Sequence, residues 1–160
     1  MADRIYLDTT VLLSVFLGRQ DPHYDGATAV LAGAQAGDFQ PVFSALVMAE
    51  TVGAGSVRAK EGQGRAKCQA KQAKAAEFVA GFGALYVELS ELDGQRAAEL
   101  SREHNLSGAD ALHLAAALRH GCVTLFTSDH GLLKVDGKVN GIRVLAPDWS
   151  RPQLDFHPGE

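Results

Sequence analysis

The sequence predicts an α/β protein built on a central parallel sheet of four to five strands, with helices on both faces. Two observations lead to this class. Short apolar stretches of strand length recur along the 160 residues, and stretches with helical periodicity separate them. Such alternation is typical of parallel strands joined by right-handed crossovers. The length fits one domain that is large enough to bury a core.

The first half of the chain begins with a strand in which Ile5 and Leu7 stand at strand spacing. Helical stretches follow, and Gly18 and Gly37 end them because glycine stops helices. Ser44 is expected to cap a further helix directly after a short strand. The expected elements are a strand at 4–7, helices at 10–18 and 27–37, a strand at 41–43 and a helix after Ser44.

The second half repeats this alternation. Residues 65–82 are rich in Ala and Lys and should be helical, and Ser90 is expected to cap the next helix. The helix after Ser107 is apolar nearly all round, which is typical of a buried helix. A continuous apolar run at 123–127 suits a central strand buried on both faces. The remaining expected elements are strands at 85–89 and 142–145 and a short helix or turn at 131–133.

We expect one domain, residues 1–148, followed by a loosely held, proline-containing tail, residues 149–160. No uninterrupted apolar run is long enough to cross a bilayer, and the N-terminus lacks a signal-peptide layout, so we expect a cytoplasmic protein. The two cysteines form no zinc-ligand pairing. Cys122 is expected in the core and Cys68 as an exposed thiol.

Positive charge is concentrated in one segment although the net charge is -4. Between residues 53 and 74, six basic residues are opposed by Glu61 alone. A charge run is more often a solvated face than a binding site, but here the rest of the chain is clearly acidic. We therefore expect contact with nucleic acid or an acidic partner, and the candidate substrate-binding residues are Arg58, Lys60 and Arg65.

Four acidic residues fall where a parallel sheet places its binding crevice, beyond the carboxyl ends of the strands. Asp8 and Asp129 directly follow predicted strands. Glu50 lies in the helix after the second strand, and Asp110 lies in the first turn of the helix after Ser107, whose orientation the sequence does not fix. Each acid also has a simpler explanation as a helix cap, a turn residue or part of a surface face.

Carboxylates gathered in one crevice would repel each other. Two unit charges about 5 Å apart cost about 3 kcal/mol at an effective dielectric constant near 20. Such a group either takes up protons or binds a cation. Ligands that are all oxygen favour Mg²⁺ or Mn²⁺ over zinc, and such an ion can polarise a phosphoryl oxygen and activate water. The expected chemistry is metal-dependent phosphodiester hydrolysis.

Polar residues beside the acids are further candidates for the site. Thr9, Thr127 and Ser128 could bond a carboxylate, a metal-bound water or a phosphate, and are candidate substrate-binding residues; otherwise they cap strand ends. His113 lies one helical turn after Asp110 and could face the same site. We expect it to be a satisfied helix histidine and not a catalytic base.

Four segments together resemble the signature segments of PIN-domain ribonucleases, and in particular the VapC toxins of toxin–antitoxin pairs. They are LDTTVL at 7–12, AE at 49–50, GADALHLAAA at 108–117 and LFTSD at 125–129. The resemblance spans the chain from Asp8 to about Leu145. It implies a three-layer α/β fold, endonucleolytic cleavage of RNA with Mg²⁺ or Mn²⁺, a homodimer and a VapB-type antitoxin as partner.

The resemblance also assigns residues to roles. It implies a catalytic quartet formed by Asp8, Glu50, Asp110 and Asp129. Of these, Asp8, Asp110 and Asp129 are the expected metal ligands. Members of the family often carry one more acid two residues after the last of these, and here Gly131 stands at that position. A second metal site, if used, would be weakened.

Two other functions are compatible with the residues. One is a phosphatase similar to haloacid dehalogenases with Asp8 as covalent nucleophile, but that class places an acid two residues later, where this chain has Thr10. The other is a non-catalytic PIN-like module that binds RNA or a protein through the basic segment. The presence of all four acids favours the nuclease.

Overall fold

The computed structural model describes residues 1–58 and 64–150. Lys60 and the tail expected at 151–160 lie outside the described residues. Trp149, the first residue of the expected tail, packs against the core, with its ring centroid 4.8 Å from that of Phe39. Its indole N–H also donates a hydrogen bond to Asp38, so Trp149 is part of the packed domain.

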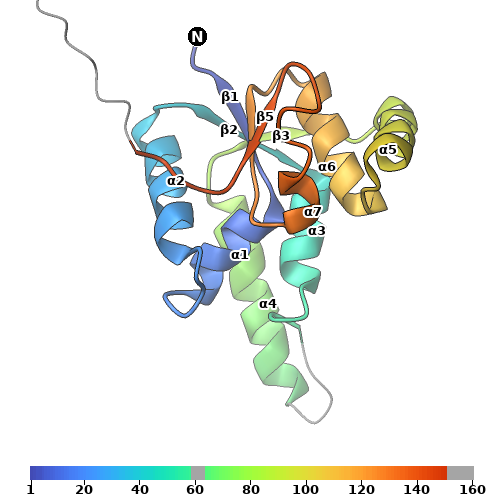
Figure 1. Ribbon diagram of the computed structural model, residues 1–160. Helices are drawn as coiled ribbons and strands as arrows, with labels where there is room; N and C mark the ends of the chain where they lie inside the picture. Colours follow the sequence, from blue (N-terminus) through green and yellow to red (C-terminus); the bar gives the residue numbers. More distant parts are fainter. Residues whose placement is uncertain (59–63, 151–160) are drawn as a thin grey trace, which may run out of the picture.

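The predicted parallel sheet has five strands, and their order is β3-β2-β1-β4-β5 (Figure 1). β1 lies at the centre and pairs with β2 on one side and β4 on the other. Its inner residues Tyr6 and Leu7 are therefore fully buried. The strands are β1 (Arg4–Leu7), β2 (Gln40–Ser44), β3 (Leu85–Val87), β4 (Thr124–Phe126) and β5 (Arg143–Leu145).

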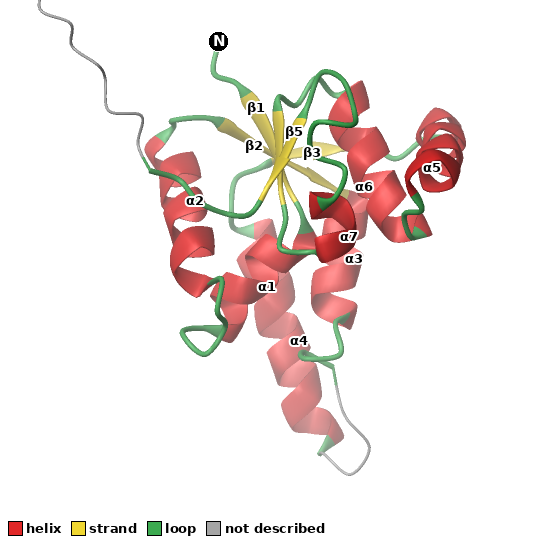
Figure 2. Cartoon of the chain, viewed as in Figure 1, coloured by secondary structure: helices red, strands yellow, loops and turns green. Residues whose placement is uncertain are grey.

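Seven helices in the described residues surround the sheet. Their bounds are α1 (Thr9–Leu17), α2 (Tyr24–Ala36), α3 (Ala45–Gly53), α4 (Arg65–Ala80), α5 (Glu91–His104), α6 (Gly108–Arg119) and α7 (His130–Leu133). Figure 2 shows α5 and α6 on one side of the sheet and α2 on the other, with α1, α3 and α4 gathered below the strands. None of these helices is long and apolar enough to cross a membrane.

The packing of the buried helix α6 determines at which edge of the sheet its first turn, with Asp110, lies. Its apolar surface is buried nearly all round, as expected, and it packs against both β2 and β4. Arg119 near its end donates to Asp93 of α5 at 2.7 Å and to the backbone oxygen of Glu88, which joins the two helices. The orientation that the sequence left open is thereby settled, and Asp110 lies at the carboxyl edge of the sheet.

One local prediction is wrong. Cys68 is buried, at 7% exposure, because α4 turns this side chain inward. Ser44 is the N-cap residue of α3 as expected, although its side chain bonds the hydroxyl of Tyr6 and makes no capping hydrogen bond. Cys122 is in the core as expected, and burial raises the pKa of its thiol to about 12.

Candidate active site

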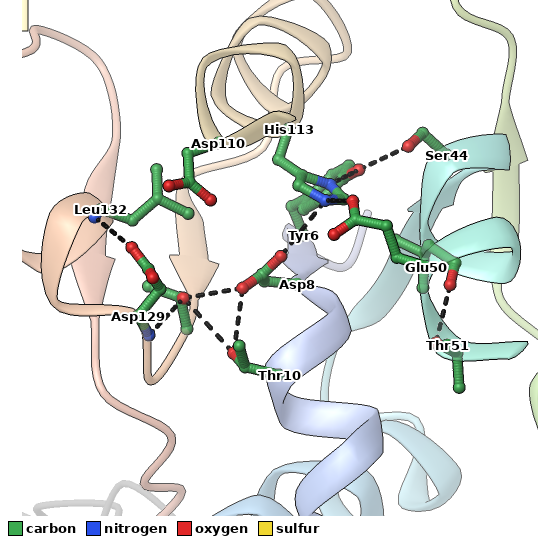
Figure 3. A network of polar contacts seen from close by, with 12 residues as sticks. Tyr6, Asp8, Thr10, Ser44, Glu50, Thr51, Asp110, His113, Asp129 and Leu132 are labelled. Carbon is green, nitrogen blue, oxygen red and sulfur yellow. Dashed lines mark hydrogen bonds and ion pairs between the residues drawn. The ribbon is translucent and has the colours of Figure 1, made fainter. Parts of the chain in front are cut away.

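The carboxylate of Asp8 is buried at the carboxyl end of the central strand, at 3% exposure. Asp8 is the N-cap residue of α1, but its side chain makes no capping hydrogen bond. Its Oδ2 instead accepts hydrogen bonds from Thr10 Oγ1 at 2.9 Å and from Thr127 Oγ1 at 2.8 Å (Figure 3). Two hydroxyl groups therefore fix the carboxylate, and the explanation of its side chain as a cap is wrong.

The same two hydroxyls tie the loop after β4 to Asp8. Thr10 Oγ1 accepts the Ser128 N–H at 2.9 Å, and Thr127 Oγ1 accepts the Asp129 N–H at 3.0 Å. Each hydroxyl donates its one proton to the carboxylate, and its lone pairs stay free to accept a backbone N–H. The position of Asp129 is thus coupled to that of Asp8 through two short hydrogen-bonded chains.

Asp110 and Asp129 face the same small volume. A Cβ atom at Gly131 would lie 2.9 Å from Asp129 Oδ2 and 3.6 Å from Asp110 Oδ2. Asp129 Oδ2 also accepts the Leu132 N–H at 2.9 Å and so caps α7. Figure 3 shows the Asp110 carboxylate projecting from α6 toward Asp129 and Asp8. The absence of a side chain at Gly131 leaves room between the two carboxylates.

Asp110 takes part in the N-terminal cap of α6 through its backbone N–H and not through its carboxylate. The Ser107 hydroxyl accepts the Asp110 N–H at 3.2 Å, which caps α6 as the spacing predicted. Burial raises the pKa of Asp110, and the negative charges of Asp129 and Asp8 raise it further. A carboxyl group that is buried beside two other acids is harder to ionise, and a bound cation would relieve this.

Glu50 reaches the cluster through a buried histidine. His113 Nε2 lies 2.6 Å from Glu50 Oε1 and 3.4 Å from Asp8 Oδ1, while its Nδ1 lies 2.8 Å from the Tyr6 hydroxyl. That hydroxyl is in turn 2.7 Å from Ser44 Oγ. Both ring nitrogens of His113 therefore have partners, as expected for a satisfied histidine. The same contacts place its ring between the carboxylates of Asp8 and Glu50 (Figure 3).

The charges around His113 favour its protonated form. Burial disfavours that form, but the hydrogen bond to Glu50 and the negative charges of Asp8, Glu50 and Asp110 outweigh it, so the pKa of His113 is raised. Burial likewise raises the pKa of Tyr6, which stays a neutral hydroxyl able to donate or accept. The histidine thus offsets part of the negative charge of the acidic cluster.

Only some of the remaining predicted site residues lie at the acidic cluster. Thr127 and the backbone of Ser128 belong to the cluster. The Thr9 hydroxyl is buried without a hydrogen-bond partner in the described part of the chain. Arg58 follows α3 and Arg65 begins α4, and both side chains are exposed on a basic surface beside α4. Lys60 lies outside the described residues.

Two residues that shape the site, Thr10 and Tyr6, were not among the predicted site residues. Thr10 holds both Asp8 and the loop after β4, and the signal was present, because it is a hydroxyl residue two positions after the acid. Tyr6 orients His113 from within the central strand. No periodicity could single it out, because a buried tyrosine in a strand reads as a core residue.

The carboxylates of the acidic cluster are of the ligand type that hard divalent cations prefer. Asp8, Asp110 and Asp129 supply only oxygen atoms, which Mg²⁺ and Mn²⁺ prefer. As the side chains stand, no three His, Cys, Asp or Glu residues among residues 1–58 and 64–150 are close enough together to hold an ion. Binding would require these carboxylates to draw together around it.

Comparisons with known proteins identify the family of this arrangement. Residues 5–138 match the PIN domain family, which is most of the chain. No curated protein matches the chain significantly. The matched range begins in the central strand and extends past Asp129. It therefore contains all four sequence segments quoted above.

Solved structures share the fold. A toxin–antitoxin complex from Klebsiella pneumoniae is 22% identical, with a TM-score of 0.61 over 89% of this chain and 97% of that one. VapBC2 from Rickettsia felis, bound to a DNA fragment from its promoter, is 17% identical, with a TM-score of 0.61 over 91% and 99%. VapC20 from Mycobacterium tuberculosis, a toxin that cleaves the sarcin-ricin loop, is 18% identical, with a TM-score of 0.59 over 79% and 90%.

Proposed function

Because the chain belongs to the PIN domain family, we propose that it is a metal-dependent endoribonuclease that acts as the toxin of a VapBC-type toxin–antitoxin pair. One observation carries the proposal. Three carboxylates, from residues after β1, in the first turn of α6 and after β4, lie at the carboxyl edge of the sheet, where the charges of Asp8 and Asp129 raise the pKa of Asp110. Parallel sheets bind their ligands at this edge.

We propose that Asp8, Asp110 and Asp129 hold the divalent ion. When bound, such an ion would polarise a phosphoryl oxygen and lower the pKa of a water. Thr10 and Thr127 keep the Asp8 carboxylate in one orientation by donating to the same oxygen. Preorganisation of this kind limits the cost of bringing charged groups together in the reactive arrangement.

Glu50 has a different role in the proposal. Its Oε1 is bonded to His113, and its Oε2 has no hydrogen-bond partner in the described residues. At about one-third exposure, its carboxylate can meet a water molecule at the edge of the cluster. We assign Glu50 to accepting a proton from the attacking water, with His113 holding its side chain in place.

The partner assignments rest on the neighbours in structure. Two of them are complexes of a toxin with its antitoxin, and the fold they share with this chain supports a VapB-type antitoxin as partner. We also propose a homodimer, which the resemblance to VapC toxins implies, and a cytoplasmic location. The toxin that cleaves the sarcin-ricin loop supports RNA as the substrate class.

The two alternative functions, a phosphatase and a non-catalytic module, differ in how well the observations support them. The phosphatase is not supported, because the chain belongs to the PIN domain family and Thr10 occupies the position of the second acid. One observation favours the non-catalytic module: no three metal-ligating side chains converge within the described ranges. That module would bind RNA equally well with and without EDTA.

Cleavage of RNA by the purified full chain tests the proposal. We expect cutting in Mg²⁺, loss of cutting in EDTA, and loss of cutting in Asp8→Asn. Asp25→Asn is the matched control, because Asp25 is exposed on α2 and should leave the rate unchanged. Equal rates for Asp8→Asn and the parent would exclude the proposed site. Failure of the parent to cut any RNA offered, in either Mg²⁺ or Mn²⁺, would favour the non-catalytic module.

A further inference from the structure

A basic pocket lies between the segment after α3 and the helix α4. It has a volume of about 830 Å³. We call it the basic pocket, and its lining is Gly55, Ser56, Val57, Arg58, Gly64, Lys67, Cys68, Ala70, Lys71 and Lys74. Four of these side chains are cationic and none is acidic. The pocket lies on the segment in which the sequence concentrates positive charge, six of the fifteen Lys and Arg residues.

The walls of the pocket are held together by hydrogen bonds. Lys71 Nζ donates to the Ser56 backbone oxygen at 2.6 Å, and Gln72 donates to the Val52 backbone oxygen at 3.1 Å. These bonds tie α4 to the end of α3 and to the segment that follows. Val57 is buried at 1% exposure and anchors that segment. The pocket is therefore a preformed feature, which lowers the entropic cost of binding.

Three cations of the pocket are free to bind an anion. Arg58, Lys67 and Lys74 are exposed, and none of them forms an ion pair with a described residue. Lys71 is already engaged with a carbonyl oxygen. Like charges that line one pocket repel each other, and a bound anion would offset this repulsion. A chain of net charge -4 thus keeps one strongly positive surface.

The lining of the basic pocket is continuous in sequence with that of a second hollow, which includes one acid of the cluster. This second hollow, of about 480 Å³, is lined by Leu13, Ala49, Glu50, Gly53 and Ala54. It includes Glu50 and ends at Ala54, the residue directly before Gly55 of the basic pocket. Gly53, the last residue of α3, lies about 4.5 Å further along the helix axis than Glu50, at about 1.5 Å of rise per residue. Figure 1 shows α3 and α4 side by side below the sheet, next to α1.

We propose that the basic pocket binds the sugar–phosphate backbone of single-stranded RNA that flanks the cleaved bond, which rests on the proposed nuclease function. A strand that is cleaved at the acidic cluster and continues along α3 past Glu50 would bring a flanking phosphate toward Arg58 and Lys67. Lys and Arg bind phosphates by charge, without reading sequence. None of the described lining residues is aromatic, so they offer no platform for stacking bases and would contact the backbone alone.

Binding of RNA to the full chain with Asp8→Asn, which prevents cleavage, tests this assignment. The probe is a fluorescein-labelled 12-nucleotide oligouridylate, titrated at several salt concentrations. The test variant adds Arg58→Gln and Lys67→Gln. The matched control adds Arg102→Gln and Lys138→Gln, which remove one Arg and one Lys from exposed positions on α5 and after α7. Circular dichroism confirms that each variant is folded.

The expected effect follows from counterion release. Each lost phosphate contact lowers the slope of log Kd against log salt by about 0.7 for a single strand, so the test variant should lose about 1.4. A contact with that slope contributes about fivefold in affinity between 1 M and 0.1 M salt. At 0.1 M salt we expect Kd to rise about 25-fold in the test variant and to stay within about twofold in the control.

Three outcomes would overturn the assignment. The first is an unchanged Kd in the test variant, and the second is an equal loss in the control. The third is tighter binding of a ten-residue oligoglutamate than of the RNA, with loss of that binding in the test variant, which would assign the pocket to an acidic protein segment. The comparison does not depend on cleavage. A parent that cuts no RNA would therefore refute the nuclease while the binding data still decide the role of the pocket.

Discussion

Replacing Thr127 with Val removes one hydroxyl from a fully buried position at the end of β4. That hydroxyl donates to Asp8 Oδ2 at 2.8 Å and accepts the Asp129 N–H at 3.0 Å. The variant keeps the shape of the side chain but leaves a buried carboxylate with one donor fewer. It also leaves a backbone N–H without its partner. We expect both lower stability and slower cleavage, because Asp8 and Asp129 lose the group that links them.

The size of the stability loss can be worked from these two bonds. A hydrogen bond to a charged group contributes about 1.5–3 kcal/mol, and one between neutral groups contributes about 0.5–1.5 kcal/mol. Thr127 makes one of each, so Thr127→Val should lower the free energy of unfolding by about 2–4 kcal/mol. The matched control is Thr51→Val, which is also fully buried but makes one neutral bond, to the Val47 backbone oxygen at 2.7 Å. It should cost about 1 kcal/mol.

Urea unfolding at pH 7 measures both variants. The midpoint should fall further for Thr127→Val than for Thr51→Val, with the slope of free energy against urea unchanged in both. A loss in Thr127→Val no greater than in Thr51→Val would refute the reasoning that this hydroxyl fixes the acidic cluster.

Two further predictions concern other parts of the molecule. The pKa of Asp93 is lowered in the folded protein, because the hydrogen bonds from Arg119 and Ser90 outweigh the burial that raises it. The ionised Asp93 therefore stabilises the fold at pH values above its unfolded pKa of about 3.9. This stabilisation is lost as the pH falls through the lower pKa of the folded state. Urea midpoints between pH 7 and pH 2 should fall less steeply in Asp93→Asn than in the parent, and parallel curves would contradict this. In Gly131→Ala, a Cβ 2.9 Å from Asp129 Oδ2 should displace that carboxylate. We expect RNA cleavage to slow by about tenfold or more, because small misplacements of groups in an active site cost large factors in rate. Gly94→Ala, where nothing lies within 4 Å, should leave the rate unchanged, and equal rates in both variants would exclude a role for the space at Gly131.

The fold was predictable because its signals are local. Alternating apolar strands and periodic helices fixed the parallel sheet, and the continuous apolar run at 123–127 correctly indicated a buried strand next to the centre. The position of Cys68 was not predictable in the same way. Its basic neighbours suggested exposure, while the register of α4 turns its side chain toward the interior. Charge in the flanking sequence does not report which face of a helix packs.

The acids of the site were predictable from topology, and their support was not. Parallel strands bring their carboxyl ends to one edge, so Asp8 and Asp129 had to be neighbours. Thr10 bonds Asp8 from only two residues away, but the bonds from Thr127 and His113 to Asp8, and from Ser128 to Thr10, cross more than one hundred residues of sequence. No spacing rule reaches that far, and only the packing of α1, α6 and β4 against β1 creates these contacts.

Binding of Mn²⁺ to the purified chain, followed by electron paramagnetic resonance of the free ion, tests the proposed metal site without depending on any RNA. We predict that the parent binds Mn²⁺, that Asp8→Asn and Asp110→Asn each weaken binding about tenfold or more, and that Asp25→Asn binds like the parent. Absence of Mn²⁺ binding in the parent, or undiminished binding in both Asp8→Asn and Asp110→Asn, would contradict the assignment of these carboxylates to a metal.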